Sequence, residues 1–265
     1  MTEVPASLVK ELRDLTGAGM MDCKRALVET GGDLEAARRL LREQGLAQAG
    51  KRAGRATSEG TVLARVDDSA GAMVAVGCET EPVSNNEEFL GFAQHLLDVV
   101  STEGPAAAEA LEDERVELVA KLGENVAIVG AERYQVEDGE VVASYIHPPA
   151  AKIGVLVQAT ASPELARLVA MHIAAARPTY VSRAEVPEEE VAAERAVYER
   201  LPEVESKPEE VRPRIVEGML AKRFFAQNVL LDQDWVHDPG LTVGNALAEH
   251  GAEVSAFVRY DVGRE

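Results

Sequence analysis

Apolar residues at helical spacing predict three short helices in the first 45 residues. The first ends at Gly17 and the second covers residues 20–30, while the third follows the capping residue Asp33 and ends at Gly45. The apolar stripe of the first helix consists of Leu8, Leu12 and Leu15. Three helices of about three turns each predict a miniature bundle that is marginally stable by itself.

A small, basic stretch at residues 47–55 predicts a linker that is partly helical at most. Its charges come from Lys51, Arg52 and Arg55. In an acidic chain such a cluster could meet an acidic partner or RNA, although a solvated linker is the more common role.

A β-hairpin followed by a helix is predicted at residues 60–100. Residues 60–66 and 72–78 are strand-like and flank a turn. After a polar loop, residues 87–100 carry an apolar stripe that must pack on the sheet, formed by Phe89, Phe92, Ala93, Leu96, Leu97 and Val100. A second helical region is predicted at residues 106–122.

The same arrangement is predicted a second time. Strands at residues 126–134 and 141–147 flank a turn and form a hairpin, and a third strand follows at residues 153–160. A helix then opens at Ser162 and closes at Pro178. Two rounds of hairpin and helix indicate two related α+β subdomains.

Composition changes again at residues 187–226, where charges dominate and apolar residues are sparse. Two antiparallel helices with narrow apolar seams are predicted there, forming a hairpin that stands off the body. An extended segment at residues 230–237, a helix at residues 241–247 and an alternating strand at residues 253–262 follow. We expect the last strand to return to the second sheet.

The predicted fold class is therefore α+β, with an N-terminal three-helix bundle, a two-part core with antiparallel sheets and an inserted helical hairpin. The predicted division of the chain is 1–55 for the bundle with its basic linker, 56–125 for the first core subdomain, 126–186 with 227–265 for the second, and 187–226 for the hairpin.

Charge and composition argue against nucleic-acid binding, membrane binding and zinc-binding or disulfide-rich classes of protein. The 265 residues contain 46 acidic and 27 basic side chains, and this net charge of −19 repels nucleic acid and anionic membranes. Cys23 and Cys78 lie far apart, so neither a disulfide framework nor a zinc site is expected. A polar start and the lack of a membrane-length apolar run predict a cytoplasmic protein.

Evidence for an enzyme is poor, since the sequence has no phosphate loop, dinucleotide fingerprint, zinc-protease motif or nucleophile elbow. The five histidines are scattered over different predicted elements. A metal-dependent hydrolase using His147, His237 and nearby carboxylates is the remaining catalytic hypothesis, and scattered ligands are unfavourable for it. We expect no cofactor and no metal.

One stretch, residues 78–86, runs as a short polar loop from the end of the strand at 72–78 to the helix at 87–100. Rigid elements on both sides position the backbone while the side chains stay accessible, which is typical of functional loops. An ordinary strand-to-helix connection capped by Asn86 is the simpler interpretation.

A second unusual stretch holds two glycines and two adjacent methionines, Met20 and Met21. Adjacent helical residues point about 100° apart, so both cannot easily be core. Either one packs and the other is merely exposed, or the soft thioethers suit a partner surface.

Several stretches together carry a family resemblance. The most specific is Ser7-Leu8-Val9-Lys10-Glu11-Leu12-Arg13 running into Thr16-Gly17-Ala18-Gly19-Met20-Met21-Asp22-Cys23-Lys24. Others are Gly32-Asp33-Leu34-Glu35-Ala36-Ala37, Arg115–Glu124 (with Leu118-Val119-Ala120-Lys121), Ile153-Gly154-Val155-Leu156-Val157, Met171-His172-Ile173-Ala174-Ala175 and Val216-Glu217-Gly218-Met219. Over almost its whole length the chain resembles bacterial elongation factor Ts, the guanine-nucleotide exchange factor of elongation factor Tu.

This resemblance implies a ubiquitin-associated-like N-terminal bundle that docks on elongation factor Tu, in its GDP-bound and nucleotide-free forms. It implies apolar docking by Met20 and Met21 and polar docking by Arg13 and Lys24. Secondary contacts with the partner's other domains are implied for His147 and the Trp235-Val236-His237 segment, with Val236 and His237 as its contact residues. The inserted hairpin would be a coiled coil, through which a homodimer or a 2:2 complex could form. No chemical catalysis and no direct contact with nucleic acid or membrane are implied.

The family's Thr-Asp-Phe-Val motif maps onto Thr80, Glu81, Pro82 and Val83, which would enter beside the partner's magnesium site and phosphate loop. Two of the four positions differ, because Glu81 adds a methylene to the carboxylate and Pro82 lacks the aromatic ring. The alternative function is therefore a binding or chaperone-like module with weakened exchange. The chain stops soon after Val262, so the extra C-terminal module of some members is expected to be absent.

Overall fold

A computed structural model describes residues 4–263, and its first part is a three-helix bundle. The helices are α1 (Ala6–Thr16), α2 (Met20–Glu29) and α3 (Leu34–Arg52). Gly17 ends α1 in the left-handed conformation, at a φ of 65°, which favours glycine. The bundle core is formed by Val9, Leu12, Cys23, Ala26, Leu27 and Ala37. The predicted bundle is confirmed, and its likeness to a ubiquitin-associated domain stays a prediction.

The third helix is longer than predicted. Asp33 caps it as expected, since its carboxylate accepts the backbone N–H of Ala36 at 2.9 Å. However, α3 continues through Gly45 to Arg52 and absorbs most of the predicted linker. Gly45 is buried, and a Cβ there would lie 3.1 Å from the Cβ of Ala120 on α6 (Glu112–Leu122). This glycine therefore permits close approach of two helices and does not stop one.

The first sheet has the order β1-β2-β3 and is antiparallel throughout. Its strands are β1 (Glu59–Val66), β2 (Ala70–Cys78) and β3 (Val126–Gln135). The predicted hairpin of the first two strands is confirmed. Helix α5 (Glu87–Glu103) buries its predicted stripe against this sheet. The second predicted helix is divided into a 3₁₀ segment, η1 (Pro105–Leu111), and α6.

The prediction that residues 126–134 and 141–147 form a hairpin is wrong. β3 pairs with β2, whereas β4 (Val141–Ile146) pairs with β5 (Ile153–Thr160) in a second sheet of order β4-β5-β8. Because β3 pairs with β2 and β4 pairs with β5, residues 136–140 connect two different sheets. The change of sheet falls after Gln135 and not after residue 125, where the predicted division lies.

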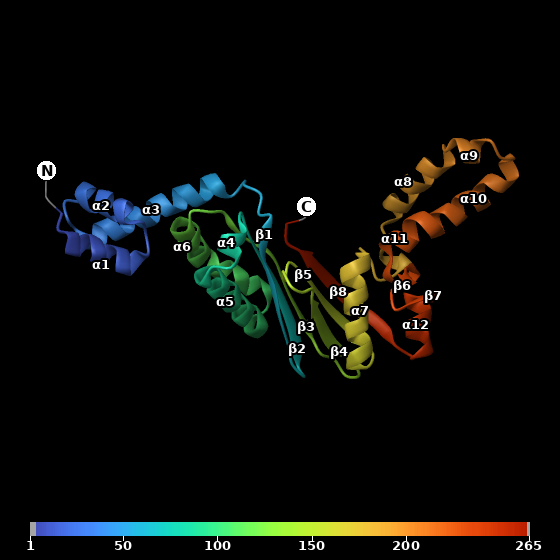
Figure 1. Ribbon diagram of the computed structural model, residues 1–265. Helices are drawn as coiled ribbons and strands as arrows, with labels where there is room; N and C mark the ends of the chain where they lie inside the picture. The colour runs from blue at the N-terminus through green and yellow to red at the C-terminus, as the bar shows by residue number, and fades with distance from the viewer. Residues whose placement is uncertain (1–3, 264–265) are drawn as a thin grey trace.

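The two sheets pack against each other, and helices cover their outer faces (Figure 1). Side chains of a strand alternate between faces, and β2 follows this rule with both faces buried. Ala72, Val74, Val76 and Cys78 face the α5 core, while Met73 and Ala75 face the second sheet. The resulting order is α5 with α6, first sheet, second sheet and α7 (Pro163–Ala176).

The C-terminal part completes the second subdomain. β8 (Glu253–Asp261) pairs with β5, which confirms the predicted return of the last strand. Before it come η5 (Leu230–Asp232), β6 (Asp234–Trp235), β7 (Asp238–Thr242) and α12 (Val243–Glu249). The expected extended segment thus begins with a 3₁₀ turn, and the expected helix starts two residues later than predicted.

The inserted hairpin projects from the body, as predicted (Figure 1). One side is formed by α8 (Glu188–Glu199) and α9 (Pro202–Glu205), which follow the short η2 (Arg183–Glu185). The returning side consists of η3 (Glu209–Val211), α10 (Arg212–Met219), the π-helical η4 (Leu220–Phe225) and α11 (Ala226–Asn228). The hairpin has a small core of its own, formed by Tyr198, Val204, Val216, Met219 and Leu220.

Candidate functional site

The loop at residues 79–86 leaves the end of β2 and contains one short helix, α4 (Glu81–Ser84). Glu81 and Pro82 are exposed, whereas Val83 is half-buried and packs on the core beneath α5. Asn86 caps α5 as predicted, accepting the backbone N–H of Glu88 at 2.9 Å. The loop therefore presents two adjacent side chains to solvent from a backbone that is anchored on both sides.

Hydrogen bonds within the loop fix the turn around Glu81. Its carbonyl accepts the hydroxyl of Ser84 at 2.9 Å and the side-chain amide of Asn85 at 3.0 Å. Pro82 lies in the first turn of α4, where a missing N–H removes no helical hydrogen bond. The proline is thus compatible with the loop geometry and leaves the exposed carboxylate of Glu81 next to a rigid ring.

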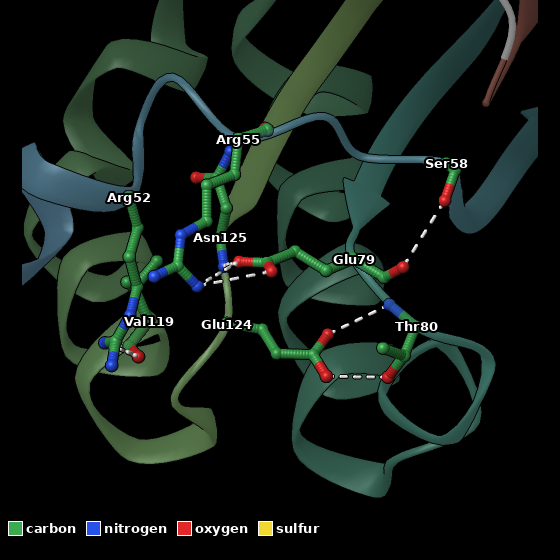
Figure 2. A network of polar contacts seen from close by, with 8 residues as sticks. All are labelled: Arg52, Arg55, Ser58, Glu79, Thr80, Val119, Glu124 and Asn125. Carbon is green, nitrogen blue, oxygen red and sulfur yellow. Dashed lines mark hydrogen bonds and ion pairs between the residues drawn. The ribbon is translucent and has the colours of Figure 1, made fainter.

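Polar contacts hold the base of the loop to the start of β3 (Figure 2). Glu124 accepts two hydrogen bonds from Thr80, and Glu79 accepts one from the backbone of Asn125. Sequence reasoning assigned no role to Glu79, Glu124 or Asn125. A usable signal was present, since Glu124 and Asn125 directly precede the strand that pairs with the end of β2.

The thiol beneath the loop is chemically inert. Cys78 is fully buried, and burial raises the pKa of its thiol to about 12. Its Sγ donates to the carbonyl of Thr80 at 3.4 Å. Because a nucleophilic cysteine needs a depressed pKa, Cys78 contributes packing at the loop base and no covalent chemistry.

The predicted docking residues of the bundle are all exposed. Met20 and Met21 are 55% and 62% exposed, so neither of them packs in the core. Cys23, fully buried on the same helix, fills the core position next to them. Arg13 and Lys24 are also exposed, on α1 and α2. The bundle therefore offers two soft apolar side chains and two cations to solvent.

The remaining predicted contact residues lie on the second subdomain. His147 follows β4, and its Nδ1 lies 3.0 Å from the hydroxyl of Tyr145. Val236 and His237 are exposed, and Nε2 of His237 donates to the carbonyl of Leu168 on α7 at 3.2 Å. The bundle, the loop and this segment lie at separate places along the molecule (Figure 1).

A buried histidine supports the segment that carries Val236 and His237. Nδ1 of His172 accepts the backbone N–H of Val236 at 3.3 Å, so Nε2 carries the proton and donates to Oε1 of Gln233 at 2.9 Å. The ring stacks on Trp235 with 5.2 Å between centroids. Burial lowers the pKa of His172, which favours the neutral ring that this geometry requires.

Within residues 4–263, no three His, Cys, Asp or Glu side chains form a group that could hold a metal ion. The hydrolase hypothesis therefore has no assembled site in the part of the chain that the structure describes. Nor does any helix of that part have the length and apolar character needed to span a membrane.

Comparison with known proteins places this geometry in a family. A family model described as "Elongation factor TS" matches residues 79–264, more than half of the chain, beginning with the first residue of the loop. The chain belongs to the elongation factor Ts family. The family resemblance inferred from the sequence is thereby confirmed.

Full-length relatives extend the match through the N-terminal bundle. "Elongation factor Ts" of Pasteurella multocida is 44% identical over 268 residues, covering 99% of this chain and 93% of that protein. The proteins of the same name from Haemophilus influenzae and Vibrio cholerae are each 43% identical, covering 99% and 98% of this chain and 92% of their own length. The similarity to these relatives therefore includes the bundle with its exposed methionines as well as the loop.

Proposed function

We propose that this chain is a guanine-nucleotide exchange factor that binds elongation factor Tu in its GDP-bound form and accelerates the release of GDP. The nucleotide-free partner then takes up GTP, and the chain carries out no chemical step. The observation that supports this function is the anchored loop of a family member, which presents Glu81 and Pro82 between β2 and α5. Such a role in translation agrees with the cytoplasmic location expected from the sequence.

The mechanism follows from linked binding. A protein that prefers the nucleotide-free partner must lower nucleotide affinity by the same factor by which nucleotide lowers its own affinity. Each tenfold change corresponds to about 1.4 kcal/mol of differential binding. In our proposal Thr80, Glu81, Pro82 and Val83 approach the partner's magnesium site and phosphate loop. The carboxylate of Glu81 then competes with the phosphate oxygens for the ion.

Docking in this proposal uses the exposed side chains of the bundle. Met20 and Met21 provide apolar contact, and Arg13 and Lys24 provide polar contact. His147, Val236 and His237 make secondary contacts with other domains of the partner. In this proposal the residues that bind the partner lie outside the loop. Different residues therefore bind the partner and disturb its nucleotide site.

The deciding experiment measures release of labelled GDP from purified elongation factor Tu at increasing concentrations of this chain. We expect a release rate that rises and saturates. Unchanged release at micromolar concentrations would exclude the proposed function.

One observation favours a second candidate, a binding or chaperone-like module with weakened exchange. Pro82 offers much less apolar surface than an aromatic ring, so the loop can fit the partner without forcing its phosphate loop aside. Stable co-purification with elongation factor Tu, without acceleration of GDP release, would favour this module.

Both candidates require the methionine pair for docking. Replacing Met20 and Met21 together by alanine should weaken binding roughly tenfold or more, because two thioethers are truncated at one contact. Titration of labelled elongation factor Tu measures the affinity. Val129→Ala on β3 is the control, because Val129 is 45% exposed and lies outside both the bundle and the inserted hairpin. Equal affinities of the double variant and the control would exclude this docking face.

We further propose that a second copy of the chain, or a 2:2 complex, assembles through the inserted hairpin. Sedimentation of the free chain and of the complex with elongation factor Tu tests this assembly. Monomers and 1:1 complexes alone would exclude it.

A further inference from the structure

The carboxylate of Glu124, which lies outside the loop, is hydrogen-bonded to the base of the loop. Glu124 follows Gly123, where α6 ends, and precedes β3. Its Oε1 accepts the hydroxyl of Thr80 at 2.6 Å, and its Oε2 accepts the backbone N–H of the same residue at 3.0 Å. Hydrogen bonds to an ionised acceptor are about twice as strong as neutral ones, so this bidentate contact restrains Thr80 in both position and direction.

A second carboxylate makes the reciprocal contact (Figure 2). Glu79 accepts the backbone N–H of Asn125 at 2.6 Å and pairs with Arg55 at 3.4 Å. The side-chain amide of Asn125 in turn donates to the carbonyl of Arg55 at 2.8 Å. Glu79 is therefore hydrogen-bonded to Asn125, and Thr80 to Glu124. In each pair a carboxylate of one segment accepts a backbone N–H of the other.

These side-chain contacts lie where the next two backbone pairs of β2 and β3 would be if the strands continued. The last paired residues of β2 and β3 are Cys78 and Val126, so Thr80 and Glu124 lie where an antiparallel pairing would place partners two residues further on. Backbone pairing stops at this point, and the carboxylates continue the connection. The rigidity of the sheet is thereby extended up to Thr80, the residue immediately before the exposed Glu81.

Thr80 is also the residue at the N-cap of α4, yet its hydroxyl makes no capping hydrogen bond. The hydroxyl donates to Glu124 instead. A threonine in this position usually satisfies the first turn of its own helix. The start of α4 is therefore bonded to Glu124 through Thr80, and Val83 of α4 packs on the core that α5 covers.

We propose that Glu124 is a positioning residue for nucleotide exchange, which acts through Thr80 to aim Glu81 and Pro82 at the partner's nucleotide site. This inference rests on the proposed function. Without the carboxylate, the N–H and hydroxyl of Thr80 would turn to water and α4 would sample several orientations. Docking through the bundle would be unaffected, because Met20 and Met21 lie on α2.

The test compares Glu124→Ala with the wild type in saturation curves of GDP release from elongation factor Tu. We expect the maximal rate at saturation to fall roughly tenfold, as for loss of hydrogen bonds to a charged group, with an unchanged half-saturating concentration. Glu124→Gln should retain activity within about threefold, because its amide oxygen can accept the N–H while its amide nitrogen donates to the hydroxyl.

The half-saturating concentration separates positioning from general destabilisation. A smaller folded fraction would raise that concentration and leave the maximal rate unchanged. Glu114→Ala is the matched control, since it removes an α6 carboxylate that bonds to His95 and not to the loop. Thr80→Val provides a second route, because it removes the hydroxyl without truncating Glu124. Combined with Glu124→Ala, it should cause no further loss.

A maximal rate for both Glu124→Ala and Thr80→Val equal to that of wild type would overturn the positioning role and leave the proposed function intact. A loss shared with Glu114→Ala would overturn it as well. Failure of the wild type to accelerate GDP release would instead reject the proposed function itself, so the two failures are distinguishable.

Discussion

Pro82 is the position at which the loop differs most in shape from the family's Thr-Asp-Phe-Val motif. It is exposed in the first turn of α4, beside Glu81, and its ring cannot reach as far as an aromatic side chain. Because the side chain of Pro82 is exposed and its missing N–H removes no helical hydrogen bond, we expect the side chain to be replaceable with little change to the loop backbone.

Pro82→Phe should therefore accelerate exchange. In the proposed mechanism a phenylalanine adds an apolar wedge where the loop approaches the partner. We expect the maximal rate of GDP release to rise several-fold, which corresponds to about 1 kcal/mol of differential binding. Stopped-flow fluorescence with a labelled GDP measures the change, and Leu90→Phe on α5 controls for added aromatic surface elsewhere. Equal rates for Pro82→Phe and wild type would mean that the ring is not limiting.

His172 gives a second prediction at this scale, a loss of stability in acid. Burial lowers its pKa in the folded state, so the neutral ring contributes stability that is present above the unfolded value near 6.5. That stability is lost as the pH falls below 6.5, because the unfolded chain binds the proton more readily. The slope attributable to one such group is at most about 1.4 kcal/mol per pH unit.

Urea unfolding of wild type and of His172→Phe between pH 5 and pH 8, about the range in which histidine titrates, measures this contribution. The wild type should lose stability more steeply toward low pH than the variant, whose aromatic ring still stacks on Trp235. Parallel curves would show that protonation of His172 is not linked to folding.

At the scale of the elements, Gly45 shows how a helix stop signal can be misleading. The sequence pattern predicted that the third helix ends there, because glycine often follows the last helical residue. The glycine is instead a contact point between α3 and α6, and this function depends on a neighbour 75 residues away in the chain, Ala120. Local periodicity contains no information about such a neighbour.

Gly45→Leu should therefore destabilise the fold by about 1–3 kcal/mol, the usual cost of overpacking a close contact. Gly50→Leu on the same helix is the control, because nothing lies within 4 Å of a Cβ at that position. Gain of helix propensity should make this control neutral or slightly stabilising. Chemical denaturation compares the two variants, and equal stabilities would contradict the close-contact role of Gly45.

Strand pairing was also only partly predictable. The pattern located the strands at 126–135 and 141–146 within a residue or two, yet it paired them with each other. Short sequence separation favours a hairpin, but β3 finds a partner in β2 and β4 finds one in β5. The reciprocal contacts of Glu79 and Glu124 were missed for the same reason, since they depend on β3 lying beside β2.

At the scale of the whole molecule, the two sheets separate the bundle and the loop from the segment with Val236 and His237 (Figure 1). The bundle lies at one end, the loop rises from the first sheet, and the segment with Val236 and His237 lies beyond α7 (Figure 1). Sequence motifs identified each group, but their placement along one extended molecule follows from packing of the sheets. A partner that touches all of them must itself be large.

The hairpin should be dispensable for folding of the rest. It packs around its own core, and the chain segments at its base are joined by a hydrogen bond from Leu230 N–H to the Tyr180 carbonyl at 2.8 Å. Replacing residues 188–223 by a short Gly-Ser linker should change the unfolding temperature by no more than about 5 °C. A shift of that size corresponds to a free-energy change of about 1–2 kcal/mol. Circular dichroism measures the midpoint, and loss of cooperative unfolding would contradict this independence.

The burial of β2 on both faces has a consequence for the local stability of the strand from which the loop leaves. Amides of a central strand with no exposed face exchange their hydrogens only when the whole domain opens. We therefore expect the amide protons of Val74 and Val76, which are fully buried, to be among the slowest to exchange with deuterium. The strand that supports the loop would then be among the last parts of the molecule to loosen on warming. Exchange activity should accordingly persist up to the temperature at which the first sheet unfolds.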